Sequence, residues 1–120
     1  MGIIKDRFKA KSEAVAAEIK DILKEHGNKV IGEVTLSQIY QGMRGMTGLV
    51  TETSLLDAQE GIRFRGYSIP ELQQKLPKAP GGDEPLPEGL FYLMLIGELP
   101  TEDEANHVTN ILQRRSHVPN

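Results

Sequence analysis

One arginine in this chain lies among closely spaced glycines, a pattern suited to binding an anion. Arg44 is flanked by Gly42, Gly45 and Gly48. Glycines let a ligand approach the backbone and leave amide N–H groups accessible, and a guanidinium pairs well with phosphate. The segment is therefore a candidate phosphate-binding loop, although its spacing matches neither the P-loop nor the dinucleotide fingerprint.

A structural role for the same arginine is the alternative. In that interpretation Arg44 forms a salt bridge with Glu52 or Asp57, and the glycines only make a tight connection. The spacing alone favours this alternative over a phosphate loop. Arg63 and Arg65 pose the same question, because on a short strand they could hold an anion or pair with Glu52 and with the nearby carboxylate at position 60. Pairing is the better interpretation for them.

The remaining reactive residue types form no catalytic constellation. The histidines, His26, His107 and His117, are far apart, are expected on helix surfaces or ends, and lack metal-ligand spacing. No serine or threonine occurs in a nucleophile-elbow pattern. Acidic clusters fall in a loop or in a first helical turn, where capping explains them. The residues thus predict no catalytic group and no metal site in this chain.

Composition narrows the possible partners. At 120 residues the chain is one domain or part of one. A formal net charge of −3 argues against an electrostatic nucleic-acid surface. The absence of cysteine excludes disulfides and cysteine-ligated metal. No apolar run approaches the roughly 20 residues of a membrane span, so we expect neither nucleic acid nor a membrane as a partner.

The first residues bear on localisation. Met-Gly-Ile-Ile-Lys-Asp-Arg-Phe has no apolar run long enough for a signal peptide, and the acidic residues Asp6, Glu13 and Glu18 argue against a transit peptide. We expect a cytoplasmic protein of bacterial type. The mitochondrial matrix is the alternative, which requires that a transit peptide was removed.

Hydrophobic periodicity predicts a mainly α-helical chain of about five helices with one small β-hairpin. A long helix over residues ~4–26 ends at Gly27-Asn28, where both residues tolerate a left-handed backbone. Thr35 then caps a brief helix that ends at Gly42. The expected organisation is an N-terminal helix in 1–28, a glycine loop and hairpin in 42–66, and helices in 68–117.

Between the glycine loop and the later helices, the sequence is typical of strands. The runs 30–34, 49–50 and 55–56 are rich in β-prone residues. Ile62 and Phe64 alternate with arginines, the period of a half-buried strand. The intervening polar residues 57–61 predict the turn of the hairpin.

The second half of the chain carries clear helix signals. Ser68 with Glu71, and Thr101 with Glu104, make two capping boxes. Between these helices, the segment Leu90–Ile96 is apolar on all sides, which predicts a buried helix. On the first of the capped helices two leucines share a face, and on the last one the residues expected to face inward are Ala105, Val108, Ile111 and Leu112.

Three stretches together resemble one enzyme family. Gly-Met-Arg-Gly-Met-Thr-Gly-Leu-Val at 42–50, Glu-Thr-Ser-Leu-Leu-Asp at 52–57 and Glu-Gly-Ile-Arg-Phe-Arg-Gly-Tyr-Ser-Ile-Pro-Glu at 60–71 are similar to the N-terminal part of citrate synthase, of the type found in mitochondria and some bacteria. Further matches run from 76 to 102. The resemblance covers nearly the whole chain and thins in the first ~25 residues.

The resemblance implies a function. Citrate synthases are mainly helical homodimers that condense acetyl-CoA with oxaloacetate in the tricarboxylic acid cycle, with acetyl-CoA and CoA as substrate and product and no permanently bound cofactor. The chain would be the N-terminal part of the large domain, and the arginine matching Arg44 is expected to contact CoA phosphate. The family's catalytic histidines and aspartate do not match any residue here.

The resemblance also sets expectations for the isolated chain. It should be inactive alone, expose hydrophobic surface and self-associate, or need the remainder of citrate synthase or a second chain as its partner. A segment of 2-methylcitrate synthase is the close alternative. A non-catalytic helical interaction module is the alternative from a different class.

Overall fold

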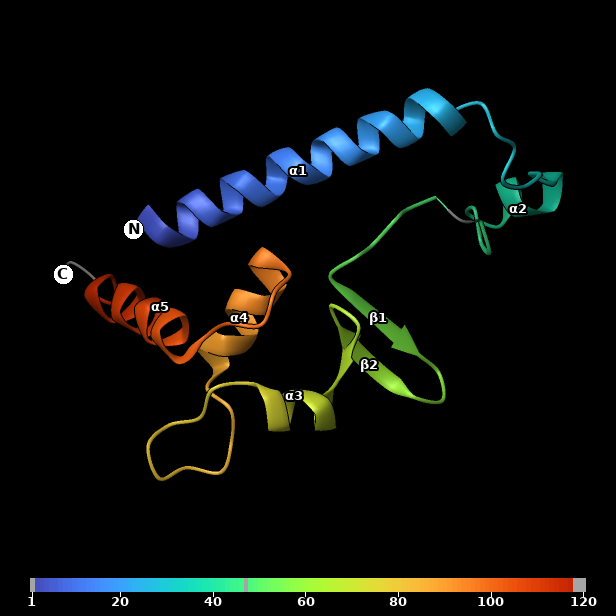
Figure 1. Ribbon diagram of the computed structural model, residues 1–120. Helices are drawn as coiled ribbons and strands as arrows, with labels where there is room; N and C mark the ends of the chain where they lie inside the picture. Colours follow the sequence, from blue (N-terminus) through green and yellow to red (C-terminus); the bar gives the residue numbers. More distant parts are fainter. Residues whose placement is uncertain (1, 47, 118–120) are drawn as a thin grey trace. The chain divides into compact units, whose positions relative to one another are not determined.

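The computed structural model describes residues 2–46 and 48–117 and divides into two compact units (Figure 1). One unit combines residues 1–9 with 51–120, and the other comprises residues 10–50. The elements are α1 (Gly2–His26), α2 (Leu36–Tyr40), β1 (Ser54–Asp57), β2 (Gly61–Phe64), β3 (Tyr67–Ser68), α3 (Ile69–Lys75), α4 (Pro87–Ile96) and α5 (Glu102–Arg114). Five helices among the described residues confirm the predicted mainly helical class.

The larger unit has its core around α4. Leu93 is fully buried against Leu72 of α3 and against Leu76, which caps the end of that helix. Tyr92 and Ile96 on α4 are buried against α5. Because α4 is apolar on several sides, it can contribute to both clusters at once. Proline occupies its first turn, and Gly97 ends it in a left-handed conformation with φ 86°.

The sheet has three antiparallel strands in the order β1-β2-β3. The predicted hairpin pairs Ser54 with Phe64 and Asp57 with Gly61. The third strand was not predicted, because β3 is only two residues long and precedes a helix cap directly. Its pairing of Phe64 with Tyr67 leaves a two-residue turn between them.

That turn corrects the expectation that Arg65 projects from the strand. Arg65 and Gly66 have φ of 48° and 87°, so both central residues are left-handed. Positive φ at both positions is the requirement of a type I′ turn, whose twist matches that of the adjoining strands. The alternation of residues 62–65 therefore stops at Phe64.

Replacing Gly66 with alanine is expected to destabilise the chain by roughly 1–2 kcal/mol. Nothing lies within 4 Å of where its Cβ would be, so the loss comes from backbone strain at φ 87° alone. Gly32 is the matched control, because its surroundings are equally open and its φ lies outside the left-handed range. Urea unfolding should show a loss for Gly66→Ala and little change for Gly32→Ala, and equal midpoints would contradict the turn assignment.

Both predicted capping boxes are present in the larger unit. The hydroxyl of Ser68 accepts a hydrogen bond from the Glu71 N–H, and that of Thr101 accepts one from the Glu104 N–H, while each glutamate reaches back to its cap. On α5, however, Leu112 is 51% exposed instead of facing inward as predicted. It lies near the end of the helix, where the described residues provide little cover.

The smaller unit contains no buried residue among those described. Its part of α1 ends as predicted at residue 26, and Thr35 caps α2 in a further capping box with Gln38. The β-prone runs 30–34 and 49–50 form no strand, which corrects that expectation, because a strand needs a partner to pair with. Apolar residues of this unit are accordingly exposed, including Ile19, Ile22, Leu23, Val30, Ile31, Leu36 and Ile39.

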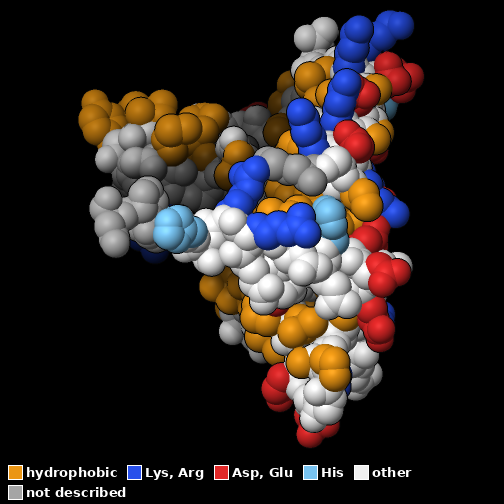
Figure 2. Space-filling model, turned by 90° about the vertical axis from the view of Figure 1, so that its left-hand side faces the viewer, with side chains coloured by type: hydrophobic (Ala, Val, Ile, Leu, Met, Phe, Trp, Pro, Cys, Tyr) orange, Lys and Arg blue, Asp and Glu red, His pale blue; other side chains and the backbone are white. Residues whose placement is uncertain are grey.

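Exposed hydrophobic surface was predicted and is present. Figure 2 shows hydrophobic side chains at the surface beside Lys and Arg side chains. In the larger unit Phe8 and Phe91 are about half exposed, at 46% and 51%. Within the described part of the chain, no helix combines the length and apolar character needed to cross a membrane.

Candidate functional site

The glycine loop, residues 42–48, follows α2, and three of its described residues are left-handed. Gly42, Met43 and Gly45 have φ of 71°, 62° and 74°. The Met43 N–H donates to the carbonyl of Gln38 at 2.8 Å, so the loop is tied to the short helix before it. Glycine reaches this conformation without strain, which explains two of the three positions.

Arg44 lies exposed within this loop. No ion pair or hydrogen bond of its side chain to another described residue of its unit is present. Glu52 and Asp57, the carboxylates considered as salt-bridge partners of Arg44, interact with other groups. A carboxylate oxygen of Glu52 lies 3.9 Å from the guanidinium of Arg65, and Asp57 accepts backbone hydrogen bonds. Thr47 of the loop lies outside the described residues, and Arg44 stays the candidate ligand-binding residue.

A cavity of about 320 Å³ adjoins the loop in the smaller unit. Gly45 and Met46 line it together with Gln38 and residues 31–34. Glu33 contributes a carboxylate to this lining, which disfavours an anion. The cavity therefore does not itself resemble a phosphate site, and the cation that the loop offers is Arg44.

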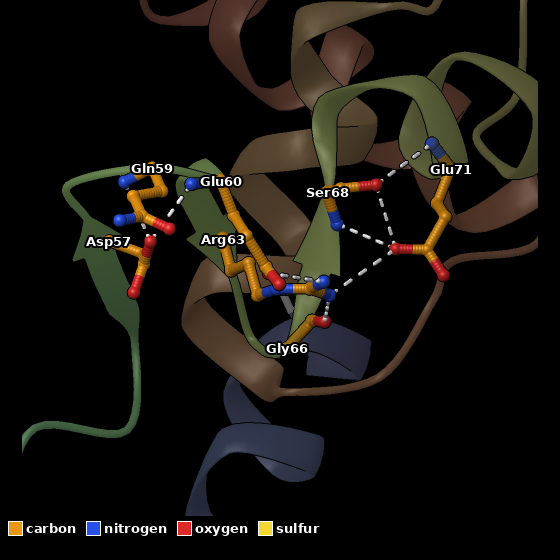
Figure 3. A network of polar contacts seen from close by, with 7 residues as sticks. All are labelled: Asp57, Gln59, Glu60, Arg63, Gly66, Ser68 and Glu71. Atoms are coloured by element: carbon orange, nitrogen blue, oxygen red, sulfur yellow. Dashed lines mark hydrogen bonds and ion pairs between the residues drawn. The ribbon is translucent and has the colours of Figure 1, made fainter.

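Arg63 is held by neighbouring groups and not free to bind a ligand (Figure 3). Its guanidinium pairs with Glu60 at 2.9 Å, donates to the carbonyl of Gly66 at 3.0 Å, and lies 3.7 Å from Glu71. The hydrogen bond and the charge of Glu60 raise the pKa of Arg63. The predicted pairing across this hairpin is confirmed.

Two carboxylates in the same region are stabilised in their charged form. Hydrogen bonds from the backbone N–H groups of Glu60 and Gln59 lower the pKa of Asp57 and fix the β1–β2 turn. Hydrogen bonds from the backbone and hydroxyl of Ser68 lower the pKa of Glu71. These hydrogen bonds account for the β1–β2 turn and for the start of α3.

Arg65 also has a structural role. Its guanidinium donates to the carbonyl oxygen of Met94 at 2.8 and 3.2 Å, joining the β2–β3 turn to the end of α4. A cation near the last carbonyls of a helix is favourable for the helix dipole. Its predicted partner Glu52 lies 3.9 Å away. The partner 29 residues along the chain was missed, because no local pattern marks it.

A second network was not foreseen from the sequence. The Tyr92 hydroxyl donates to Glu104 at 2.9 Å, and Arg7 pairs with the same carboxylate at 2.9 Å. Burial tends to raise the pKa of Glu104, but hydrogen bonds from Thr101 and Tyr92 and the charge of Arg7 outweigh it, so that pKa is lowered. The sequence identified Glu104 only as a capping residue.

Raising the pH above 10 is expected to destabilise the chain through Tyr92. Burial, and then the hydrogen bond to Glu104, raise the pKa of Tyr92 from 10.0 to about 12. Because the folded state holds this proton more tightly than the unfolded state, the contribution is complete below pH 10 and is lost as the pH rises to about 12. The tyrosinate absorbance that Tyr92→Phe removes should titrate near 12, and a midpoint near 10 would contradict the network.

The histidines lie apart in the structure as well. His26 is exposed and 3.9 Å from Glu25. The Nε2 atom of His107 is buried with no hydrogen-bond partner, which corrects its expected place on the helix surface. Among the described residues, no group of three or more His, Cys, Asp or Glu side chains is placed to hold a metal ion.

Known proteins match this chain closely. Residues 42–120 match the family described as "Citrate synthase, C-terminal domain". The chain is similar to "Citrate synthase, mitochondrial" of Aspergillus niger, at 55% identity over 97% of the chain and 24% of that protein. It is also similar to the proteins of the same name from Saccharomyces cerevisiae, at 55% identity with the same coverage, and Xiphias gladius, at 56% identity over 84% of the chain and 22% of that protein.

These relatives correct one expectation and bear out another. Their names are mitochondrial and their sources are fungi and a fish, so the expected bacterial, cytoplasmic protein is wrong. That expectation relied on the first residues, although the chain spans only about a quarter of the length of the curated relatives it matches. With the family match over residues 42–120 and about 55% identity across nearly the whole chain, the chain belongs to the citrate synthase family.

Proposed function

We propose that this chain is the N-terminal part of the large domain of a citrate synthase, which condenses acetyl-CoA with oxaloacetate to citrate and CoA. The observation that supports it most is the 55% identity over 97% of the chain to a protein of that name. Within such an enzyme, the chain supplies scaffold and a coenzyme contact. The mitochondrial matrix is the compartment we propose, after the names of the relatives.

Arg44 is the coenzyme contact in this proposal. Coenzyme A carries phosphates, and a guanidinium binds phosphate through charge-assisted hydrogen bonds. The exposed position of Arg44 and the left-handed backbone of Gly42, Met43 and Gly45 support a loop that can meet a ligand closely. Arg63 and Arg65 are engaged by the protein itself, so Arg44 is the better candidate.

The catalytic groups lie elsewhere in this proposal. The family's catalytic histidines and aspartate match no residue of this chain, and the chain spans about a quarter of the length of its relatives. The isolated chain is therefore proposed to be inactive and to need the remainder of citrate synthase, which acts as a homodimer. Acetyl-CoA and CoA bind as substrate and product, with no permanent cofactor.

Arg44→Ala in the full-length enzyme is expected to weaken CoA binding roughly tenfold, or about 1.4 kcal/mol. The apparent KM for acetyl-CoA should rise while kcat changes little, because the contact is with a non-reacting part of the substrate. Arg114→Ala is the matched control, since Arg114 is exposed in the last turn of α5. Calorimetry with CoA provides the measurement, and equal affinities of Arg44→Ala and wild type would contradict the role of Arg44.

An assay of CoA release separates citrate synthase from the two alternatives, 2-methylcitrate synthase and a non-catalytic interaction module. CoA release from acetyl-CoA plus oxaloacetate by the full-length protein supports citrate synthase. Faster release from propionyl-CoA would indicate 2-methylcitrate synthase instead. No release from either substrate would favour a non-catalytic helical interaction module.

A further inference from the structure

Two methionines of the glycine loop have no role in the proposed function. Met43 directly precedes Arg44, and Met46 follows it by two residues. Peroxides oxidise the thioether of methionine to a sulfoxide, which turns a flexible apolar side chain into a polar one. Because the peroxide has to reach the sulfur atom, the exposure of each methionine decides which one reacts first.

Met43 is the most accessible methionine in the part of the chain that the structure describes. It is 59% exposed, whereas Met46 and Met94 are both partly buried. Met46 lines the cavity of about 320 Å³ beside the loop, and Met94 lies near the end of α4. Exposure therefore favours Met43 as the site of oxidation.

The backbone at Met43 is fixed by hydrogen bonds on both sides. Its N–H donates to the carbonyl of Gln38 at 2.8 Å, and its carbonyl accepts from the N–H of Met46 at 3.2 Å. Met43 has a left-handed backbone with φ 62°, which is uncommon for a residue other than glycine. The thioether is thus attached at a defined point directly before Arg44.

The role proposed for Arg44 requires that this loop be open in the free enzyme. A coenzyme that arrives from solution can meet the guanidinium only if solvent reaches it, and Arg44 is exposed. Met43 is its immediate neighbour in the chain. The access of peroxide to Met43 therefore rests on the proposed function.

We propose that Met43 is a site of reversible oxidation by hydrogen peroxide, and that its sulfoxide weakens the binding of CoA at Arg44. The sulfur attacks one peroxide oxygen, so that an S–O bond forms while the O–O bond breaks. The departing hydroxide takes the proton of the transferred hydroxyl group and leaves as water. The sulfur loses two electrons, and the peroxide gains them.

Reduction restores the thioether. A methionine sulfoxide reductase carries out this step. Two thiols supply the two electrons and become a disulfide, and the sulfoxide oxygen leaves as water. The modification is therefore a switch between two forms of the loop.

The sulfoxide oxygen acts on CoA binding as a hydrogen-bond acceptor one residue from Arg44. The N–H groups of this guanidinium are the donors that we propose for a CoA phosphate. A second acceptor in the same loop competes with the phosphate for them. Oxidation should weaken CoA binding about threefold, less than Arg44→Ala does, because the cation remains.

Peroxide treatment of the full-length protein, followed by peptide mass spectrometry, measures sulfoxide formation at each methionine. Met43 should react roughly fivefold faster than the partly buried Met94, which is the internal control. Saturating desulfo-CoA, which has no thiol to consume the peroxide, should slow the reaction at Met43 and leave that at Met94 unchanged. Equal rates at the two positions, or no protection of Met43, would overturn the proposal.

Calorimetry with CoA, before and after oxidation, tests the consequence. Each variant is compared with its own untreated sample. Met43→Leu removes the thioether but keeps an apolar side chain of similar volume, and Met46→Leu and Met94→Leu are the matched controls. Wild type and both controls should lose affinity about threefold on oxidation, and Met43→Leu should lose none.

Treatment of the oxidised wild type with the reductase should restore its affinity for CoA. A loss that persists in Met43→Leu, that disappears in Met46→Leu, or that the reductase does not reverse would contradict a switch at Met43. The peroxide must be removed before each titration, because it would also oxidise the thiol of CoA.

The failure of this proposal and that of the proposed function can be told apart. If the untreated full-length protein releases CoA from acetyl-CoA and oxaloacetate but Met43 reacts no faster than Met94, the oxidation site is refuted and the proposed function stands. If the untreated protein neither binds nor releases CoA, the proposed function is refuted, together with the effect of oxidation on the coenzyme.

Discussion

Replacing Leu93 with alanine is expected to lower the free energy of unfolding by about 3 kcal/mol, within the range of roughly 2–5 kcal/mol for buried leucines. Leu93 is fully buried in the middle of α4 and packs with Leu72 and Leu76. Partly buried side chains from β2, β3, the first half of α4 and the segment after α4 surround this cluster. They are held by their own elements and cannot fill the space that the lost methyl groups leave.

Leu23→Ala controls for the change of residue type. Leu23 lies on α1 and is 62% exposed, so the same substitution should change the free energy of unfolding by less than about 0.5 kcal/mol. Urea unfolding of both variants provides the comparison. Equal losses at the two positions would show that the cluster around Leu93 is not the core of the chain.

Glu104→Ala is expected to lower the free energy of unfolding by about 2–3 kcal/mol. The substitution removes half of the α5 capping box, the partner of Arg7, and the acceptor of the Tyr92 hydroxyl. Tyr92 is 1% exposed, so its hydroxyl would remain buried without a partner. That orphaned group accounts for most of the expected loss.

Glu102→Ala is the control for Glu104→Ala, because Glu102 is exposed in the same first turn of α5. Glu102→Ala should lower the free energy of unfolding by only a few tenths of a kcal/mol, because it removes only a favourable interaction with the helix dipole. A double-mutant cycle with Tyr92→Phe isolates the hydrogen bond. Strictly additive losses in Glu104→Ala and Tyr92→Phe would contradict a direct contact between the two side chains.

Local signals predicted much of the fold. The caps at Ser68 and Thr101 work through residues three positions away, and Gly97 ends α4 through its own backbone, so short spacings identified them. The hairpin turn likewise depends on Asp57 and its nearest neighbours. Interactions of this kind are fixed by the order of adjacent residues.

Contacts between elements were not predictable in this way. The hydrogen bond from Arg65 to Met94 spans 29 residues, and that from Tyr92 to Glu104 spans 12. β3 exists because Gly66 and the residue before it turn the chain back, which the alternating pattern did not reveal. These features require knowledge of which elements meet, and a single chain's pattern does not supply it.

The candidate site shows the same division. Glycine spacing singled out the loop around Arg44, and the structure gives that loop its left-handed backbone. Spacing also offered Glu52 as a partner for Arg65, and that pair is present at 3.9 Å. The other carboxylate considered for Arg44, Asp57, accepts backbone hydrogen bonds in the β1–β2 turn. The assignment of Arg44 to a coenzyme phosphate remains a proposal that depends on the family.

The smaller unit, residues 10–50, holds no buried side chain among those described, and this has a consequence for its dynamics. Without an interior of its own, its backbone amides are protected only by local helix and turn hydrogen bonds. Hydrogen exchange in the isolated chain should therefore be fast throughout this unit and slow in α4. Ligand binding at Arg44 would then carry the entropic cost of ordering the whole unit. The affinity for the ligand would therefore depend on the surface that holds residues 10–50 in place.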